Sequence, residues 1–341
     1  MLSVLASGLA VGLAFGYALQ RGRFCTNTGF RDALLIQDGT LLRAWALAVV
    51  VQMLGVTALS QWGLLPTSVP PFWLLANVLG GVTFGVGMVL AGGCSSGTCY
   101  RVGEGLAASL VALIAFGVGI VVMAEGALAP LQEALRSAEF RVDGAAMTLP
   151  NLLGVSPWLV VLPLTLAAGV WFWRAGASSY RSGGWDWRAA GAALGVIGVA
   201  AWLASSGTGR SFGLSMTGPL RSWFEGLFTG RLALDWGSML IVGLLLGSFL
   251  SAWSNGELRW RVAKGGRLLQ SGVGGLLMGF GAQLAGGCTI GHSLTGLSVL
   301  SVGSVVTTLS ILVGAWGMAI WLFVLPARRM QREMAAPAAS D

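Results

Sequence analysis

Long unbroken apolar segments constrain the fold of this chain more than any other feature. Residues 105–124 and 304–325 are two such segments, and each has the ~20 residues that a helix needs to cross a bilayer. Transmembrane β-strands alternate apolar and polar residues, so these runs exclude a β-barrel. Hydrophobic residues make up 55% of the 341 residues and charged residues only 10%. We therefore expect an all-α, polytopic integral membrane protein.

Hydropathy predicts about nine transmembrane helices. The expected segments are 3–19, 41–60, 73–90, 104–124, 157–173, 189–206, 235–253, 270–286 and 298–325. The first segment has no basic residue before it and is followed by Arg21 and Arg23. We therefore expect it to be a retained span and not a cleaved signal peptide.

The basic residues indicate the orientation in the membrane. If the N-terminus is outside and every segment crosses, the inner loops hold 15 of the 20 basic residues: Arg21, Arg23, Arg31, Arg43, Arg101, Arg174, Arg181, Arg188, Arg259, Arg261, Lys264, Arg267, Arg328, Arg329 and Arg332. The outer loops hold Arg136, Arg141, Arg210, Arg221 and Arg231. The positive-inside rule thus places the N-terminus outside and the C-terminus in the cytoplasm. Because the basic residues are scattered, we expect membrane lipids as partners and no nucleic acid.

A repeated motif divides the chain. Residues 80–97 align without gaps with 274–291, and ten of the eighteen positions are identical, including the run "LAGGC". A weaker echo relates "LAVGLAFG" at 9–16 to "LIVGLLLG" at 240–247. In the orientation above, the two GGC segments cross in opposite directions, as in the inverted repeats of secondary transporters. The alternative is a decayed duplication whose glycines only allow close helix packing.

This repeat suggests the domain organisation. We expect a single transmembrane transport domain over residues 1–330 and a short cytoplasmic tail at 331–341. Within the domain, the first repeat covers about 5–125, connecting helices cover about 155–206, and the second repeat covers about 235–325.

The glycine pairs predict helices that break or re-enter inside the membrane. Such a break must be buried in protein or line a cavity, because lipid does not satisfy free backbone groups. We expect Gly93 and Gly287 to need an unusual backbone conformation or a close approach, whereas Gly85 and Gly279 should tolerate Ala within their helices. The helix that restarts after each break presents free N–H groups, which favour an anion.

The cysteines supply the chemistry of the expected site. Cys94 and Cys288 follow the two glycine pairs, while Cys25 lies in "GRFCTNTGFRD" near the N-terminus. Thiols are weak hydrogen-bond donors and suit a soft, sulfur-bearing anion. Cys99 matches Ser293 in the repeat and is expected to be an apolar filler. With one His and four Cys in the chain, no metal site is expected.

Further residues near the motifs have two interpretations each. His292 either binds substrate or a thiol, or is hydrogen-bonded to a backbone carbonyl. Arg101 either attracts the anion at the inner mouth or anchors the loop. The stretch 207–234 is too polar to cross and is expected to form a short interfacial or re-entrant segment. Its arginines either draw anions into an outer vestibule or bind lipid headgroups.

The motifs "GRFCTNTGFRD", "LAGGCSSGTCYR" and "LAGGCTIGHSLTG" resemble the three cysteine motifs of the YeeE/YedE family of bacterial membrane proteins, and the resemblance extends from about 5 to 325. It implies a helical thiosulfate-uptake protein of the bacterial inner (cytoplasmic) membrane with inverted halves and a narrow waist. Cys25, Cys94 and Cys288 would be the thiols along the path, and S–H···S hydrogen bonds would bind the terminal sulfur. The resemblance also implies a separate soluble sulfur-carrier protein of the TusA type on the cytoplasmic side.

Two alternatives remain open at this point. One is a permease for another sulfur- or selenium-containing species. The other is a membrane thiol oxidoreductase that exchanges disulfides through Cys94 and Cys99, which would make the chain an enzyme. We favour transport, with no enzymatic activity and no cofactor, because no closely spaced CxxC pair is present.

The first testable prediction concerns orientation. The charge asymmetry predicts a cytoplasmic C-terminus. A reporter that works only in the cytoplasm, such as a fluorescent protein, should therefore be active when it is fused after residue 341. A reporter that is active only in the periplasm serves as the control. Activity of that periplasmic fusion would reverse the assignment and the direction of both GGC segments.

Overall fold

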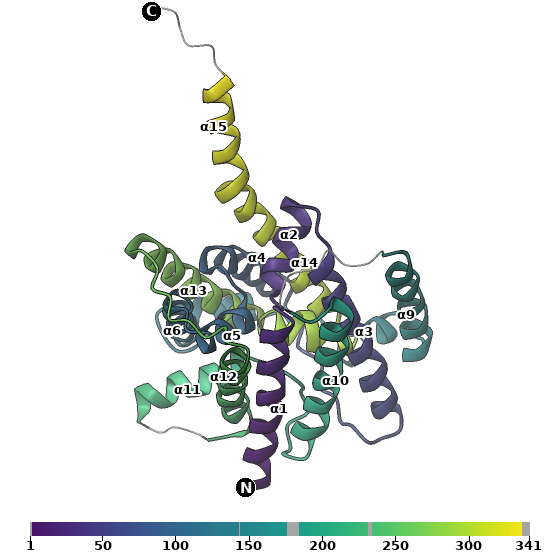
Figure 1. The fold of residues 1–341 in the computed structure, drawn as a ribbon. Helices are drawn as coiled ribbons and strands as arrows, with labels where there is room; N and C mark the ends of the chain where they lie inside the picture. Colours follow the sequence, from purple (N-terminus) through teal and green to yellow (C-terminus); the bar gives the residue numbers. More distant parts are fainter. Residues whose placement is uncertain (1, 143, 176–183, 231–233, 336–341) are drawn as a thin grey trace, which may run out of the picture.

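The computed structural model describes residues 2–142, 144–175, 184–230 and 234–335, and within these ranges the chain forms helices and isolated bridges without a β-strand (Figure 1). The elements are α1 (Leu2–Arg21), α2 (Thr26–Leu35), α3 (Thr40–Gln61), α4 (Leu74–Ala91), α5 (Ser95–Gly103), α6 (Ala107–Ala124), α7 (Ala129–Leu135), α8 (Leu149–Leu153), α9 (Pro157–Arg174), α10 (Trp187–Ser206), α11 (Thr217–Thr229), α12 (Trp236–Ser254), α13 (Gly265–Ala285), the π-helical η1 (Ile290–Gly296), α14 (Val302–Ala319), the π-helical η2 (Ile320–Val324) and α15 (Leu325–Ala335).

The predicted spans are confirmed. Within the described ranges, nine helical stretches are long and apolar enough to cross a membrane, and each coincides with a predicted segment. Three of these stretches, Leu2–Leu35, Leu74–Gly103 and Val302–Arg328, combine a long helix with shorter helical elements that follow it. The chain is thus an all-α, multi-pass membrane protein.

Some sequence predictions fall outside the described residues. These are the loop residues Arg181 and Arg231 and residues 336–341 of the predicted tail. The tail residues before 336 belong to α15, which leads away from the helical bundle (Figure 1). The polar stretch after α10 contains the 13-residue helix α11.

Glycines set how the long helices pack. A Cβ on Gly12 of α1 would lie 2.9 Å from Gly243 Cα of α12. Successive contacts advance along both helices together, so α1 and α12 run parallel. In contrast, a Cβ added at Gly80 of α4 would lie 2.7 Å from the carbonyl oxygen of Gly281 in α13. A Cβ added at Gly87 would likewise lie 2.7 Å from the carbonyl oxygen of Gly274. Helices α4 and α13 therefore cross antiparallel, with their backbones in close contact.

Each of these two helices also packs on a second partner. Gly85 of α4 lies against the carbonyl of Ile311 in α14, and Gly279 of α13 lies against the carbonyl of Phe116 in α6. A Cβ at either glycine would overlap that carbonyl. The expectation that Gly85 and Gly279 tolerate Ala is therefore wrong, because the neighbouring backbone occupies the space that the methyl group needs.

The order of long and short helices is the same in two parts of the chain. From α1 to α6 the lengths are 20, 10, 22, 18, 9 and 18 residues. From α10 to α14 they are 20, 13, 19, 21, 7 and 18 residues. In both parts a short element follows the first and the third long helix. The first GGC motif precedes α5, and the second precedes η1.

The second prediction follows from the glycine contacts. Gly85→Ala and Gly279→Ala should each destabilise the protein by roughly 1–3 kcal/mol, because a rigid backbone must move. Gly169→Ala in α9 is the matched control, since its added Cβ meets nothing within 4 Å. Thermal unfolding of the purified protein in detergent measures the effect. Equal melting temperatures for all three variants would contradict these close contacts.

Candidate functional site

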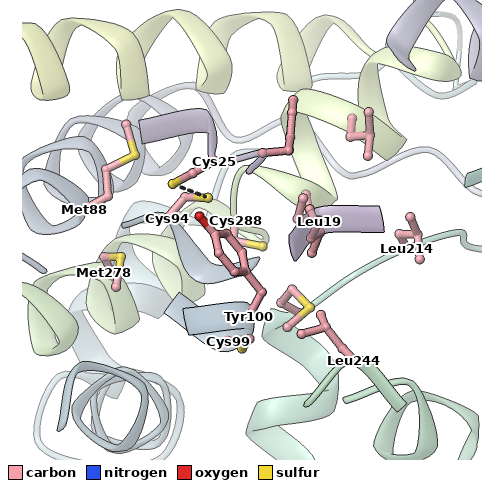
Figure 2. Close-up of a cluster of buried hydrophobic side chains, with 14 of the residues drawn as sticks. Leu19, Cys25, Met88, Cys94, Cys99, Tyr100, Leu214, Leu244, Met278 and Cys288 are labelled. Carbon is pink, nitrogen blue, oxygen red and sulfur yellow. Dashed lines mark hydrogen bonds between the residues drawn. The ribbon is translucent and has the colours of Figure 1, made fainter. Parts of the chain in front are cut away.

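Two of the three predicted thiols touch. Cys25 is the N-cap residue of α2, and Cys94 is the N-cap residue of α5. Their Sγ atoms lie 3.7 Å apart, and both side chains are fully buried. Cys288 is also fully buried and belongs to the same cluster of buried side chains (Figure 2). The structure thus brings together three sulfur atoms that are far apart in the sequence.

The Cys94 sulfur acts as a helix cap. The backbone N–H of Gly97 donates to Cys94 Sγ at 3.4 Å, and Ser96 Oγ lies 3.6 Å from the same sulfur. A side-chain cap normally satisfies one of the free N–H groups at a helix start. Gly97 leaves room for the thiol pair, because a Cβ there would overlap Cys25 Sγ.

The helix breaks at the GGC motifs are present, but the unusual conformation lies at the first glycine of each pair. Gly92 has φ +78° and Gly286 has φ +85°, and both end a long helix in the left-handed region. The predicted site residues Gly93 and Gly287 are close-approach positions instead. An added Cβ would lie 3.0 Å from Arg101 Nη1 at Gly93 and 2.9 Å from the His292 ring at Gly287.

Arg101 covers the end of α4. Its guanidinium donates to the Gly92 carbonyl and, at 3.4 Å, to Thr28 Oγ1. Its charge also lies over the Tyr100 ring, 5.6 Å from the centroid. The side chain therefore satisfies a carbonyl left free at the helix break and places a positive charge beside the first motif.

Arg136 covers the end of α13 in the same way. It donates to the Leu284 carbonyl at 3.1 Å and to the Gln283 carbonyl, and it lies 4.4 Å from the centroid of the Trp73 ring. Burial, with a smaller effect from Arg221, lowers the pKa of Arg136 to about 10, so the group stays charged at neutral pH. Sequence reasoning gave Arg136 only a place in an outer loop, because 147 residues separate it from Gln283.

His292 is part of the framework around the second motif. The buried ring has Nδ1 3.0 Å from Ser304 Oγ and Nε2 3.1 Å from the Ala285 carbonyl. This geometry matches the second of the two interpretations, a hydrogen bond to a nearby backbone carbonyl. The imidazole connects the end of α13 to α14.

Cys99 is fully buried in the same apolar cluster. In Figure 2 it lies near the base of the Tyr100 side chain, away from the Cys25–Cys94 contact. All four cysteines are free thiols. Within the described ranges, no group of three or more His, Cys, Asp or Glu side chains has the arrangement of a metal site.

A cavity of about 240 Å³ lies against the second motif, and we call it the outer cavity because Arg136 and Arg221 in its lining belong to predicted outer loops. Its lining includes Trp73, Arg136, Thr217, Arg221 and Gly286. This cavity therefore reaches the loop that carries Cys288.

The structure describes two arginines of the polar stretch 207–234, Arg210 and Arg221, and their surroundings differ. Arg221 is paired with Glu125 at 2.9 Å and with Glu225. Arg210 lies 5.1 Å from the centroid of the Trp236 ring. Of the predicted vestibule arginines that the structure describes, Arg221 lines the cavity and Arg210 packs on an aromatic ring.

Comparison with known proteins agrees with this architecture. The sulphur transport family matches residues 21–317. The thiosulfate transporter TsuA of Spirochaeta thermophila is 37% identical over 93% of this chain and 98% of its own length. The protein of the same name from Escherichia coli K12 is 35% identical over 98% of this chain and 99% of its own. A probable transporter, YedE of Salmonella typhimurium, is 36% identical over 29% of this chain and 24% of its own.

These relatives are transporters, as expected for this chain, and they confirm the resemblance that the cysteine motifs indicated. The match covers most of the nine membrane spans and all three cysteine motifs. The chain therefore belongs to the sulphur transport family.

Proposed function

We propose that the chain carries thiosulfate across the bacterial inner membrane into the cell, through a waist lined by Cys25, Cys94 and Cys288. The observation that carries this proposal is the buried contact between Cys25 and Cys94 at 3.7 Å, with Cys288 in the same cluster. The full-length relatives named thiosulfate transporters support the substrate. The N-cap positions of the first two thiols place them where helix ends favour an anion.

Thiols suit this substrate because they are neutral and weak donors. The terminal sulfur of thiosulfate is a soft acceptor, and a protonated thiol donates an S–H···S hydrogen bond to it. A thiolate would repel the anion, so the thiols act in their protonated form. Several weak sites in series allow the anion to enter and also to leave.

Positive charge is available on both sides of the thiols. Arg101 lies beside the first motif and Arg136 beside the second, and each already donates to backbone carbonyls. We propose that these arginines attract the anion electrostatically, while Gly93 and Gly287 keep the backbone close to its path. His292 contributes by holding the second motif in place.

The helix directions support two inverted halves. Gly80 contacts Gly281, and Gly274, which matches Gly80 in the repeat, contacts Gly87, which matches Gly281. Such reciprocal contacts between antiparallel helices are those of a two-fold axis. The start of α1 and the end of α15 lie at opposite ends of the molecule (Figure 1), which agrees with an N-terminus outside and a cytoplasmic C-terminus.

We also propose the domain organisation that the repeat suggested, with one transport domain over 1–330. Its repeats cover about 5–125 and 235–325, joined by helices at about 155–206. The equal order of long and short helices favours extending the second half back to α10. On the cytoplasmic side, a separate carrier of the TusA type would receive the sulfur.

The third prediction concerns uptake of labelled thiosulfate into vesicles that contain the purified protein. Cys94→Ala and Cys288→Ala should each reduce uptake at least roughly a hundredfold, with normal amounts of protein in the membrane. Removing one buried thiol should cost only ~1–2 kcal/mol of packing, so loss of folding is not the expected cause. Cys25→Ala should also reduce uptake strongly, because its sulfur contacts Cys94.

Cys99→Ala is the matched control. Its thiol is equally buried, yet its repeat partner is Ser293, so uptake should be unchanged. If the Cys94→Ala, Cys288→Ala double variant transports thiosulfate at the parental rate, the thiols are packing residues. If labelled selenium or other sulfur anions enter faster than thiosulfate, the chain is a permease for another species.

The fourth prediction separates a transporter from a thiol oxidoreductase. Protein purified without oxidant should show four alkylated cysteines by mass spectrometry after denaturation, as the four free thiols imply. Added copper–phenanthroline, an oxidant that removes two electrons and two protons per disulfide, should link Cys25 to Cys94, whose sulfurs are 3.7 Å apart. A Cys94–Cys99 disulfide in the untreated protein would instead favour the oxidoreductase.

A further inference from the structure

A sulfur residue followed by a hydroxyl residue stands at the start of four short helical elements. The dipeptides are Cys25-Thr26 at α2, Cys94-Ser95 at α5, Met216-Thr217 at α11 and Cys288-Thr289 at η1. In α2, α5 and α11 the sulfur residue is the N-cap, and the hydroxyl residue is the first of the helix. All four sulfur residues are fully buried.

Three of these hydroxyls are buried without a hydrogen-bond partner. They are Ser95 Oγ, Thr217 Oγ1 and Thr289 Oγ1, and the exposed fractions of their residues are 0%, 5% and 1%. A buried hydroxyl that makes no hydrogen bond is costly, and the large majority of such groups in proteins have a partner. Three unpartnered hydroxyls that each adjoin a buried sulfur therefore indicate an acceptor that binds there.

The positions of these hydroxyls follow the two halves of the chain. Ser95 and Thr289 occupy the same position in the aligned GGC segments. Thr217 opens α11, which has the place in the second half that α2 has in the first. Thr217 also lines the outer cavity together with Gly286, two residues before Cys288. The hydroxyls thus extend from the outer cavity to the buried thiols.

We propose that Ser95, Thr217 and Thr289 donate hydrogen bonds to the oxygen atoms of the transported anion, while the adjacent sulfur residues contact its terminal sulfur. This inference rests on the proposed transport of thiosulfate and adds the residues that recognise its sulfonate end. Thiosulfate carries three oxygens and one terminal sulfur on a central sulfur atom. A site built of alternating sulfur and hydroxyl groups matches both ends of this ion.

The same pairing explains how a site without a free basic side chain distinguishes its substrate. A hydroxyl donates a stronger hydrogen bond to a charged oxygen than a thiol does, whereas the thiol matches the larger, softer sulfur. Met216 is fully buried beside Thr217 and has no S–H to donate, so it would offer only a polarizable contact. Thr217 is then the donor of that pair.

The test uses Thr289→Val and Ser95→Ala, which remove the hydroxyls and keep the thiols. Loss of a hydrogen bond to a charged group should raise the half-saturating thiosulfate concentration for uptake at least roughly tenfold. The melting temperature of the ligand-free protein should stay equal or rise, because an unsatisfied buried group is removed. Thr289→Ser keeps a hydroxyl at this position, so its half-saturating thiosulfate concentration should equal that of the parent protein.

Ser271→Ala is the matched control. Its hydroxyl is also fully buried and unpartnered, but it follows Gln270 and not a sulfur residue. If Thr289→Val and Ser95→Ala have the parental half-saturating thiosulfate concentration, the inference is wrong. It is also wrong if the melting temperature is lower than that of the parent in both Thr289→Val and Thr289→Ser. Absence of thiosulfate uptake by the parent protein would instead overturn the proposed function, and the two failures are distinguishable.

Discussion

The structure depends on satisfying the backbone of two helices that stop inside the protein. Where α4 ends at Gly92 and α13 ends at Gly286, the last carbonyls lose their intrahelical partners. Arg101 donates to one of these ends, while Arg136 and His292 donate to or contact the carbonyls of the other. Because side chains from other segments supply these partners, the chain is free to turn and to start a new short element with a cysteine at or just before its first turn.

Close packing of glycines then decides where the two helix ends meet. The antiparallel contact between α4 and α13 is made of backbone against backbone, at Gly80 with Gly281 and at Gly87 with Gly274. A larger residue at any of these positions would push the helices apart by the width of a side chain, and with them the cysteines that follow. In a bilayer, where burial of apolar surface contributes little to helix association, such contacts are a main source of specificity.

Much of this architecture could be predicted from the sequence, because its signals are local. Apolar runs of membrane length gave all nine spans, and the GG pairs gave both helix breaks. Contacts between distant segments could not be predicted. The capping role of Arg136 depends on a carbonyl 147 residues away, and intolerance of Ala at Gly85 depends on the backbone of α14. The sequence similarity between 9–16 and 240–247 lies in α1 and α12, which are parallel and pack closely through their glycines. This similarity therefore reflects shared helix packing and not a pair of inverted repeats.

In the described residues, the proposed anion path would run past arginines that are already engaged with the backbone, and this has a consequence for transport. Arg101 and Arg136 stand beside the two motifs, but each shares its donors with backbone carbonyls, whose partial negative charge weakens the field that an ion would feel. A bare buried guanidinium would bind a divalent anion tightly and hold it. The neutral thiols, hydroxyls and helix N–H groups of the proposed path would bind the anion more weakly and at several points. Rapid passage requires such a series of weak sites, since binding that is too favourable at one point becomes a barrier to leaving it.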